Sequence, residues 1–149
     1  MRRLVAAALV ALAVQSPGVV LGQAAATRLA ILQAEDRRAS TPRDLAVLRS
    51  GARSGDPLTA RFALRALGRL ERPALIPDIL GGLRHSQPEV RAEAANAAAQ
   101  AASGWREGGA PAAPLASLQA SLIARLRVEA EPSVRAALCE SIARLPYSA

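Results

Sequence analysis

The two side chains best suited to catalysis, an imidazole and a thiol, each occur once in the sequence, as His85 and Cys139. A nucleophilic cysteine needs a base beside it, and a catalytic histidine needs a partner within hydrogen-bond reach. A single thiol also excludes an internal disulfide bond and a cysteine-based metal site. The sequence has no His-Glu pair, Gly-rich phosphate loop, nucleophile elbow or zinc-ligand spacing. We therefore expect no enzyme activity and no cofactor, with Cys139 packed in or near the core and His85 as a charge or cap at a helix end.

The segment 103–111, SGWREGGAP, holds the only tryptophan of the chain, Trp105, followed by Arg106. Trp and Arg are the residue types most enriched at binding hot spots, and loops on rigid scaffolds carry function more often than other segments do. Trp105 and Arg106 are therefore our candidate binding residues. In the alternative, Trp105 folds back as a lid over the Ala-rich segment 88–102, which lacks bulky side chains.

All 19 basic residues are arginine, and the formal net charge is +7. Such a charge suggests acidic partners or nucleic acid, but the absence of lysine beside abundant Ala, Arg and Gly also fits the amino-acid bias of a GC-rich genome. Arg61, Arg65 and Arg69 are spaced by four, as phosphate-following residues on a helix would be. Proteins that bind single strands also stack bases on aromatic side chains, and only 2% of this chain is aromatic. We expect no nucleic-acid partner.

Residues 1–26 have the layout of a signal peptide, and we expect them to be removed on export. Arg2 and Arg3 precede an apolar run, Leu4–Val14, which Pro17 and Gly18 end. The run is short for a membrane span, which needs about 20 residues, so we expect no membrane association after signal cleavage. Cleavage sites are predicted after Gly22, Ala24 or Ala26. An uncleaved membrane anchor is the alternative, and in either case the protein is predicted to work outside the cytoplasm, in the periplasm or secreted from a bacterium.

The rest of the chain, 27–149, is predicted to be all-α. The sequence is 51% hydrophobic, and its apolar residues are mostly Ala and Leu, which favour helices. We group the expected helices as pairs near 26–53, 57–84 and 88–127, followed by a half-repeat at 132–145. A core of alanines buries little apolar surface in each helix pair, so we expect several pairs to stack and share one core.

Three segments share one pattern, in which a polar residue and a proline precede about four helical turns. They are Asp56–Leu70, Gln87–Ala101 and Glu131–Leu145. Proline is tolerated in a first helical turn, where its missing N–H costs nothing, and Asp56 suits the N-cap position before it. Internal repetition of this kind predicts a stacked repeat protein.

The repeated segments resemble the HEAT repeat. The signature is Pro-x-Val-Arg, which occurs at 88–91 and at 132–135, and ALGRL at 66–70 is typical of the short bacterial form. The resemblance implies an armadillo-type α-solenoid of stacked antiparallel helix pairs that binds other proteins. It also implies that Arg91 and Arg135 are structural and pair with acidic groups or carbonyls between neighbouring repeats.

We expect the apolar face of the last helix to have nothing packed on it downstream. Its residues are Val134, Leu138, Ile142 and Leu145. Solenoids need polar caps to stay soluble, so this half-repeat is a predicted surface for self-association or marks a chain that continues elsewhere.

The favoured function is an exported, non-enzymatic HEAT-repeat scaffold that binds a protein or peptide partner. The alternative is the repeat portion of a truncated or split secreted prolyl isomerase of the cyclophilin type. AEDRRA at 34–39 and the ending ARLPYSA resemble parts of such proteins. The sequence alone does not fix which helix face binds.

Overall fold

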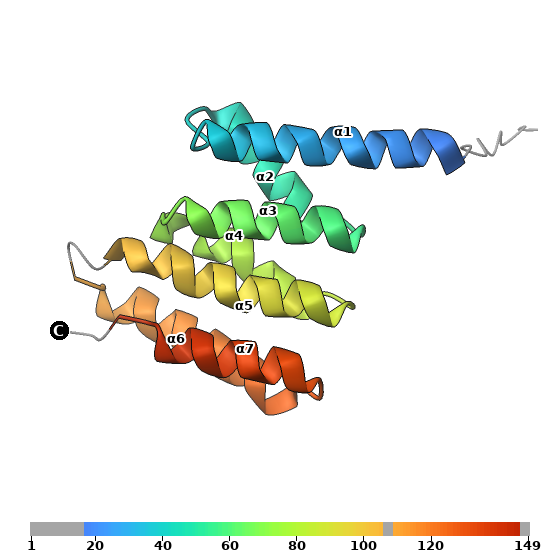
Figure 1. Ribbon diagram of the computed structural model, residues 1–149. Helices are drawn as coiled ribbons and strands as arrows, with labels where there is room; N and C mark the ends of the chain where they lie inside the picture. The colour runs from blue at the N-terminus through green and yellow to red at the C-terminus, as the bar shows by residue number, and fades with distance from the viewer. Residues whose placement is uncertain (1–16, 106–108, 147–149) are drawn as a thin grey trace, which may run out of the picture.

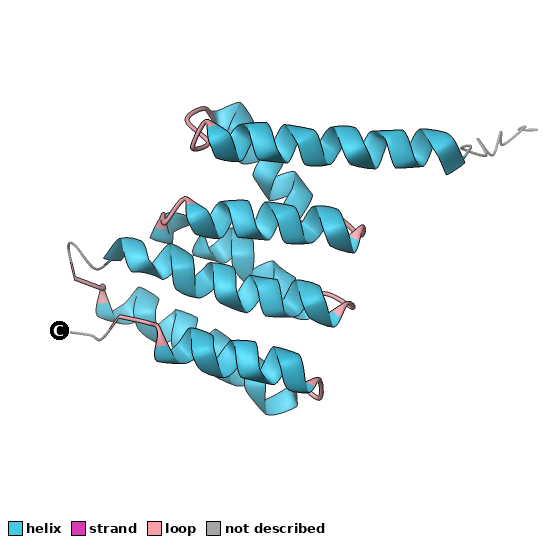
Figure 2. Ribbon diagram, viewed as in Figure 1, coloured by secondary structure: helices cyan, strands magenta, loops and turns pink. Residues whose placement is uncertain are grey.

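The computed structural model describes residues 17–105 and 109–146, and side chains from residue 22 onward. Its helices stack in two layers, as Figures 1 and 2 show. One layer contains α1 (Pro17–Asp36), α3 (Pro57–Arg69), α5 (Pro88–Ala102) and α7 (Pro132–Ala143), each packed on the next. The other contains α2 (Pro42–Ala52), α4 (Ile76–Leu80) and α6 (Ala112–Val128). The described residues contain no strand, and the predicted all-α, HEAT-like solenoid is confirmed.

Local sequence signals place the helix starts. Proline occupies the first turn of α2, α3, α5 and α7, and for the last three of these helices this was predicted. The Asp56 carboxylate accepts a hydrogen bond from the Thr59 N–H at 3.0 Å, which confirms Asp56 as the N-cap of α3. At α2, Thr41 and Asp44 form a reciprocal capping box, which satisfies two backbone donors that the helix leaves free.

Two helices differ from their predicted bounds. The first begins at Pro17 rather than at 26, because no proline interrupts the chain between Gly18 and Asp36. The helix expected at 73–84 is divided into the 3₁₀ turn η1 (Pro73–Leu75), α4 and the 3₁₀ turn η2 (Gly81–Arg84). Pro77 removes an N–H donor, and the Gly81-Gly82 pair disfavours a regular helix. The first 16 residues of the predicted signal peptide lie outside the described part.

Small residues let the helices of the first layer approach closely. Gly68 on α3 faces Ala97 on α5, and a Cβ placed on Gly68 would lie 2.8 Å from the Ala97 Cα. Gly51 on α2 is similarly crowded by Ile31 and Ala63. The core around these contacts is made mainly of alanines and leucines from every layer of the stack.

The contacts pair each helix of the second layer with the helix that follows it, whereas the sequence grouping pairs it with the helix that precedes it. Helix α2 packs on α3, α4 and η2 pack on α5, and α6 packs on α7. Helix α7 thus has α6 as its partner, although the sequence analysis treats it as an unpaired half-repeat. Helix α5 itself carries alanines on nearly every side. Its sequence pattern therefore does not indicate whether it packs on the helix before it or on the helix after it.

The prediction that the apolar face of α7 is open was wrong. Val134, Leu138 and Leu145 are buried, and Ile142 packs against the core. Because α7 lies against both α5 and α6, this face is covered within the chain and is not available for self-association.

The expected burial of Cys139 was also wrong, because its side chain is exposed. Cys139 occupies the repeat position that Leu64 holds in α3. Leu64 is covered by the helix that follows it, at Gly82 of η2. No described helix follows α7, so the equivalent side of α7 faces solvent.

Candidate functional site

A buried carboxylate in the turn before α7 joins three helices. Glu129 is 1% exposed at its side chain. It accepts two hydrogen bonds from Arg91 of α5, both at 2.8 Å, and two from Arg125 of α6, at 2.8 and 2.6 Å. The bonds from Arg91 hold the pKa of Glu129 well below its ordinary 4.5, at about 2.

The two signature arginines have the structural role that the HEAT resemblance implies. Besides Glu129, Arg91 donates to the carbonyl oxygens of His85 and Ser86, at 3.0 and 2.8 Å. Arg135 donates to the carbonyl oxygens of Leu126 and Glu129, at 3.0 and 3.1 Å. Each arginine therefore closes the turn between two helices, which confirms the sequence interpretation.

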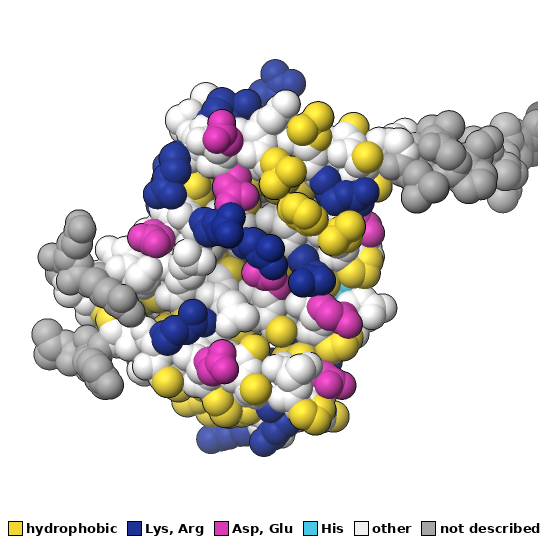
Figure 3. Space-filling model, in the orientation of Figure 1, with side chains coloured by type: hydrophobic (Ala, Val, Ile, Leu, Met, Phe, Trp, Pro, Cys, Tyr) yellow, Lys and Arg dark blue, Asp and Glu magenta, His cyan; other side chains and the backbone are white. Residues whose placement is uncertain are grey.

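Many of the other arginines form ion pairs between helices. Arg65 pairs with Glu93 across α3 and α5, and Arg69 pairs with Glu35 across α3 and α1. Figure 3 shows acidic and basic side chains interspersed over the face that these helices form. Because Arg65 and Arg69 are engaged in this way, the row of arginines on α3 is not a free cationic track.

Trp105 is positioned by the turn η3 (Ser103–Trp105), which follows α5 without a break. A Cβ on Gly104 would collide with the carbonyl oxygen of Glu71, so only glycine allows the chain to pass here. This close approach brings Trp105 to the start of η1, where its half-buried ring packs against the core. Arg106, the other candidate binding residue, lies outside the described residues.

Trp105 lines the first of two hollows between α4 and α6. This hollow has a volume of about 280 Å³. Its lining is largely apolar, and it carries no charged side chain: Pro73, Ala74, Ile76, Pro77, Leu80, Trp105, Pro114, Ser117 and Leu118. The ring of Trp105 therefore contributes to an apolar surface that reaches solvent, rather than covering α5 alone.

The second hollow continues the first toward the other end of α6. Its volume is about 500 Å³, and Leu80 lines both hollows. The remaining lining residues are Leu83, Arg84, Ser121, Ala124, Arg125 and Val128. Ser121 follows Ser117 by one helical turn, so the two hollows form one groove, which we call the α4–α6 groove.

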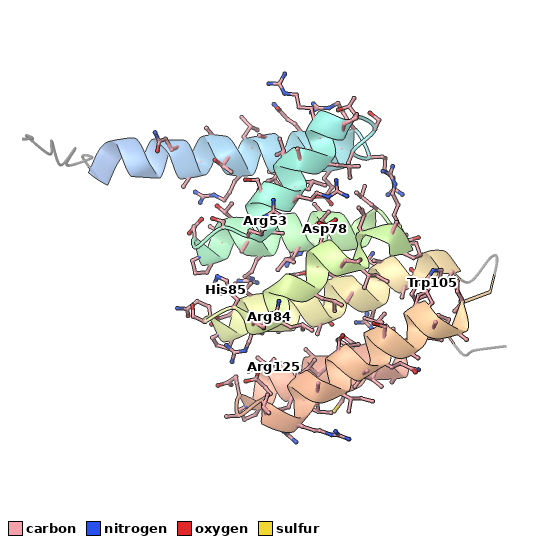
Figure 4. All side chains as sticks on the ribbon, turned by 180° about the vertical axis from the view of Figure 1, so that it is seen from behind. Arg53, Asp78, Arg84, His85, Trp105 and Arg125 are labelled. Atoms are coloured by element: carbon pink, nitrogen blue, oxygen red, sulfur yellow. The ribbon has the colours of Figure 1, made fainter. Side chains whose placement is uncertain are left out.

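Figure 4 shows this side of the molecule, with Trp105 beside the start of α6 and with Arg84 and Arg125 toward its end. Arg84 is exposed, and its side chain has no ion pair or hydrogen bond to any described residue. Val128 is 71% exposed at the same end. The groove therefore has an uncharged apolar end and a basic end.

Sequence reasoning identified Trp105 but missed Leu80, Arg84 and Arg125. The signal that was missed is one of position. Arg84 is the last residue of η2, and Arg53 directly follows α2, so successive helical segments of one layer each end at a cation. Such cations favour helix C-termini in general. This general preference explains both arginines without a binding role, and only the groove beside Arg84 suggests such a role.

The lone histidine serves the backbone. His85 Nδ1 accepts a hydrogen bond from the Gln87 N–H at 3.0 Å, in the turn that leads into α5. Among the described residues, no group of three His, Cys, Asp or Glu side chains is arranged to hold a metal ion. No helix in that part of the chain is both long enough and apolar enough to cross a membrane.

Comparison with known proteins links the repeats to one family. Residues 45–116, from within α2 to the first residues of α6, match the family model for HEAT repeats. This range includes the α4 wall of the groove, Trp105 and the start of the α6 wall. No curated protein and no solved structure matches the chain.

Proposed function

We propose that this HEAT-repeat protein is an exported scaffold without catalysis of its own, and that it binds a protein or peptide partner in the α4–α6 groove. HEAT repeats generally serve as scaffolds for protein interactions. The observation that carries the proposal is the continuous groove from Trp105 to Arg84, which combines an apolar lining with a few polar groups. Pockets that bind ligands commonly have this composition.

The groove is suited to capturing a partner because helical elements form both of its walls. Leu80 and Leu118 support the walls from the core side, while Ser117 and Val128 face outward. A preformed apolar surface reduces the ordering cost that a partner must overcome on binding.

Two observations support a role without catalysis. The imidazole of His85 is occupied by a backbone N–H, and the thiol of Cys139 lies on the outer side of α7. Neither group lines the α4–α6 groove. Nothing in the described residues or in the comparisons favours the prolyl isomerase alternative.

Export rests on the sequence of residues 1–26, with a basic start and a short apolar run before small residues. The test is to express the full chain in a bacterium that has a periplasm and to determine the mass of the exported form. We expect a chain that begins after Gly22, Ala24 or Ala26. A full-length chain in the cytoplasm would refute export, and a full-length chain in the membrane would support the anchor instead.

The binding function is tested by selecting ligands from a random six-residue peptide library on the purified full chain. The informative variant is Ser117→Trp, because Ser117 is exposed on α6 and its enlargement fills the groove. The matched control is Ala116→Trp, since Ala116 is also exposed on α6 but does not line the groove. We expect selected peptides to bind Ser117→Trp at least about tenfold more weakly than wild type, and to bind the control normally. A library that yields no binder, or binders that ignore Ser117→Trp, would refute the proposed site.

A further inference from the structure

We infer that the α4–α6 groove is directional: it binds an extended peptide segment with an apolar side chain at the Trp105 end and a carboxylate at the Arg84–Arg125 end. This inference rests on the proposed function, because it specifies what kind of peptide the groove receives. It follows from the charges at the two ends, from the lining and from the dimensions of the groove.

The basic end has unused positive charge. Arg84 has no partner among the described residues, and it lies across the groove from Arg125. Arg91, Arg125 and Glu129 together contribute two cations and one anion, and the Glu129 carboxylate is buried with both oxygens engaged. The two charged residues that line this end of the groove, Arg84 and Arg125, are both cations.

The geometry of Arg125 leaves a donor for a ligand. Its bonds to Glu129 use Nε and Nη2, so Nη1 makes no hydrogen bond to a described residue. A guanidinium donates most strongly to a carboxylate or phosphate. Arg84 and the free edge of Arg125 therefore complement a single anionic group on the partner.

The opposite end excludes charge. Three prolines and a tryptophan contribute to the 280 Å³ hollow: Pro73, Pro77, Pro114 and Trp105. A charged side chain placed there would lose hydration without gaining a partner. An aliphatic or proline side chain would bury apolar surface against these rings, which is favourable.

The length of the groove fits a short extended segment. Along α6 the groove runs from Pro114 to Val128, a helical rise of about 21 Å. About six extended residues span that length.

The test uses the six-residue peptides selected on the full chain, resynthesised with a fluorescent label. Each is made with its acidic group intact and with that group replaced by the neutral amide, and binding is measured by fluorescence anisotropy. We expect the carboxylate form to bind about tenfold more tightly. Central proline is expected to be tolerated, since an extended segment accepts it and a helix does not.

The protein variant is Arg84→Gln, and its matched control is Arg53→Gln. Both arginines are exposed at a helix end of the same layer and have no partner among the described residues, but only Arg84 lines the groove. Arg84→Gln is expected to reduce the tenfold preference to within about twofold. Arg53→Gln is expected to keep the full preference.

Two pairs of peptides distinguish the sources of the carboxylate. One pair differs in an acidic side chain, and the other in a free or amidated C-terminus. A preference in either pair that Arg84→Gln removes supports the inference. Binding that depends on Ser117 but shows no carboxylate preference would overturn the inference and leave the proposed function intact. If no selected peptide depends on Ser117, the proposed function fails and the inference fails with it.

Discussion

Replacing Glu129 by glutamine should loosen the end of the solenoid. Glutamine has nearly the shape of glutamate, so the substitution removes the charge and leaves the packing in place. The carboxylate that now accepts four hydrogen bonds from Arg91 and Arg125 becomes an amide with a single acceptor oxygen. The NH₂ group of the glutamine then faces one of the two guanidinium groups, and that guanidinium loses its hydrogen-bond acceptor.

The expected loss in the free energy of unfolding is about 3 kcal/mol. Removing one member of a buried ion pair costs about 3–5 kcal/mol. The lower end applies because the Arg91 and Arg125 side chains are 12% and 23% exposed, so water reaches the unpaired groups. For a chain of this size, each kcal/mol lowers the melting temperature by about 2–4 °C, which predicts a decrease of about 6–12 °C.

Thermal unfolding followed by circular dichroism measures this decrease, and hydrogen exchange locates it. The matched control is Glu140→Gln, because Glu140 is exposed on α7. We expect faster exchange in α6 and α7 of Glu129→Gln, whereas α2 and α3, which lie far from Glu129 in the stack, should keep their protection. A melting temperature within 1 °C of wild type would refute the reasoning.

The same comparison has a defined pH dependence. The pKa of Glu129 is about 2 in the folded protein and 4.5 ordinarily, so the folded state favours the ionised form. Its stabilisation is complete above pH 4.5 and is lost as the pH falls from 4.5 toward 2. The difference between wild type and Glu129→Gln should therefore shrink in this range, and a constant difference would contradict the assignment.

Three further predictions follow from packing, capping and exposure. Gly68→Ala should lower the free energy of unfolding by about 1–2 kcal/mol, because the added methyl meets the Ala97 backbone. Gly81→Ala should raise the free energy of unfolding by up to about 1 kcal/mol, because nothing lies within 4 Å of the added Cβ. Urea unfolding measures both changes. Asp56→Ala should cost about 1 kcal/mol in the same assay, through loss of the α3 cap. Cys139 should react fully with a thiol reagent in native buffer, since its side chain is exposed; protection until unfolding would contradict this.

The sequence predicted the starts of α3, α5 and α7 well because they depend on local chemistry. A proline and a polar cap determine where α2 and α3 begin, with little influence from the rest of the chain. It predicted the role of Arg91 through the family resemblance. It did not predict which neighbour each helix packs on, because α5 presents alanines on several sides and is buried by α3, η2 and α7 together.

The candidate site was only partly predictable for the same reason. Trp105 could be singled out because it is a unique residue in an insertion. Leu80 and Arg84 are ordinary residues in sequence, and their relevance depends on the separation between α4 and α6. That separation depends on contacts between residues that are far apart in the sequence. Helices α3 and α5 approach closely at Gly68, whereas α4 and α6 make few direct contacts.

The total charge of the chain was a poor guide to the proposed binding chemistry, whereas the position of unpaired charge is informative. Most described arginines are engaged with carboxylates or carbonyl oxygens of neighbouring helices, as Arg65 and Arg91 are. The side chains of five have no ion pair or hydrogen bond among the described residues: Arg43, Arg53, Arg61, Arg84 and Arg127. Of these, Arg84 is the one that lines the α4–α6 groove. In the proposed binding mode, a single unpaired cation beside an apolar hollow selects a ligand by where the ligand's charge lies, and a net charge of +7 cannot provide that selectivity.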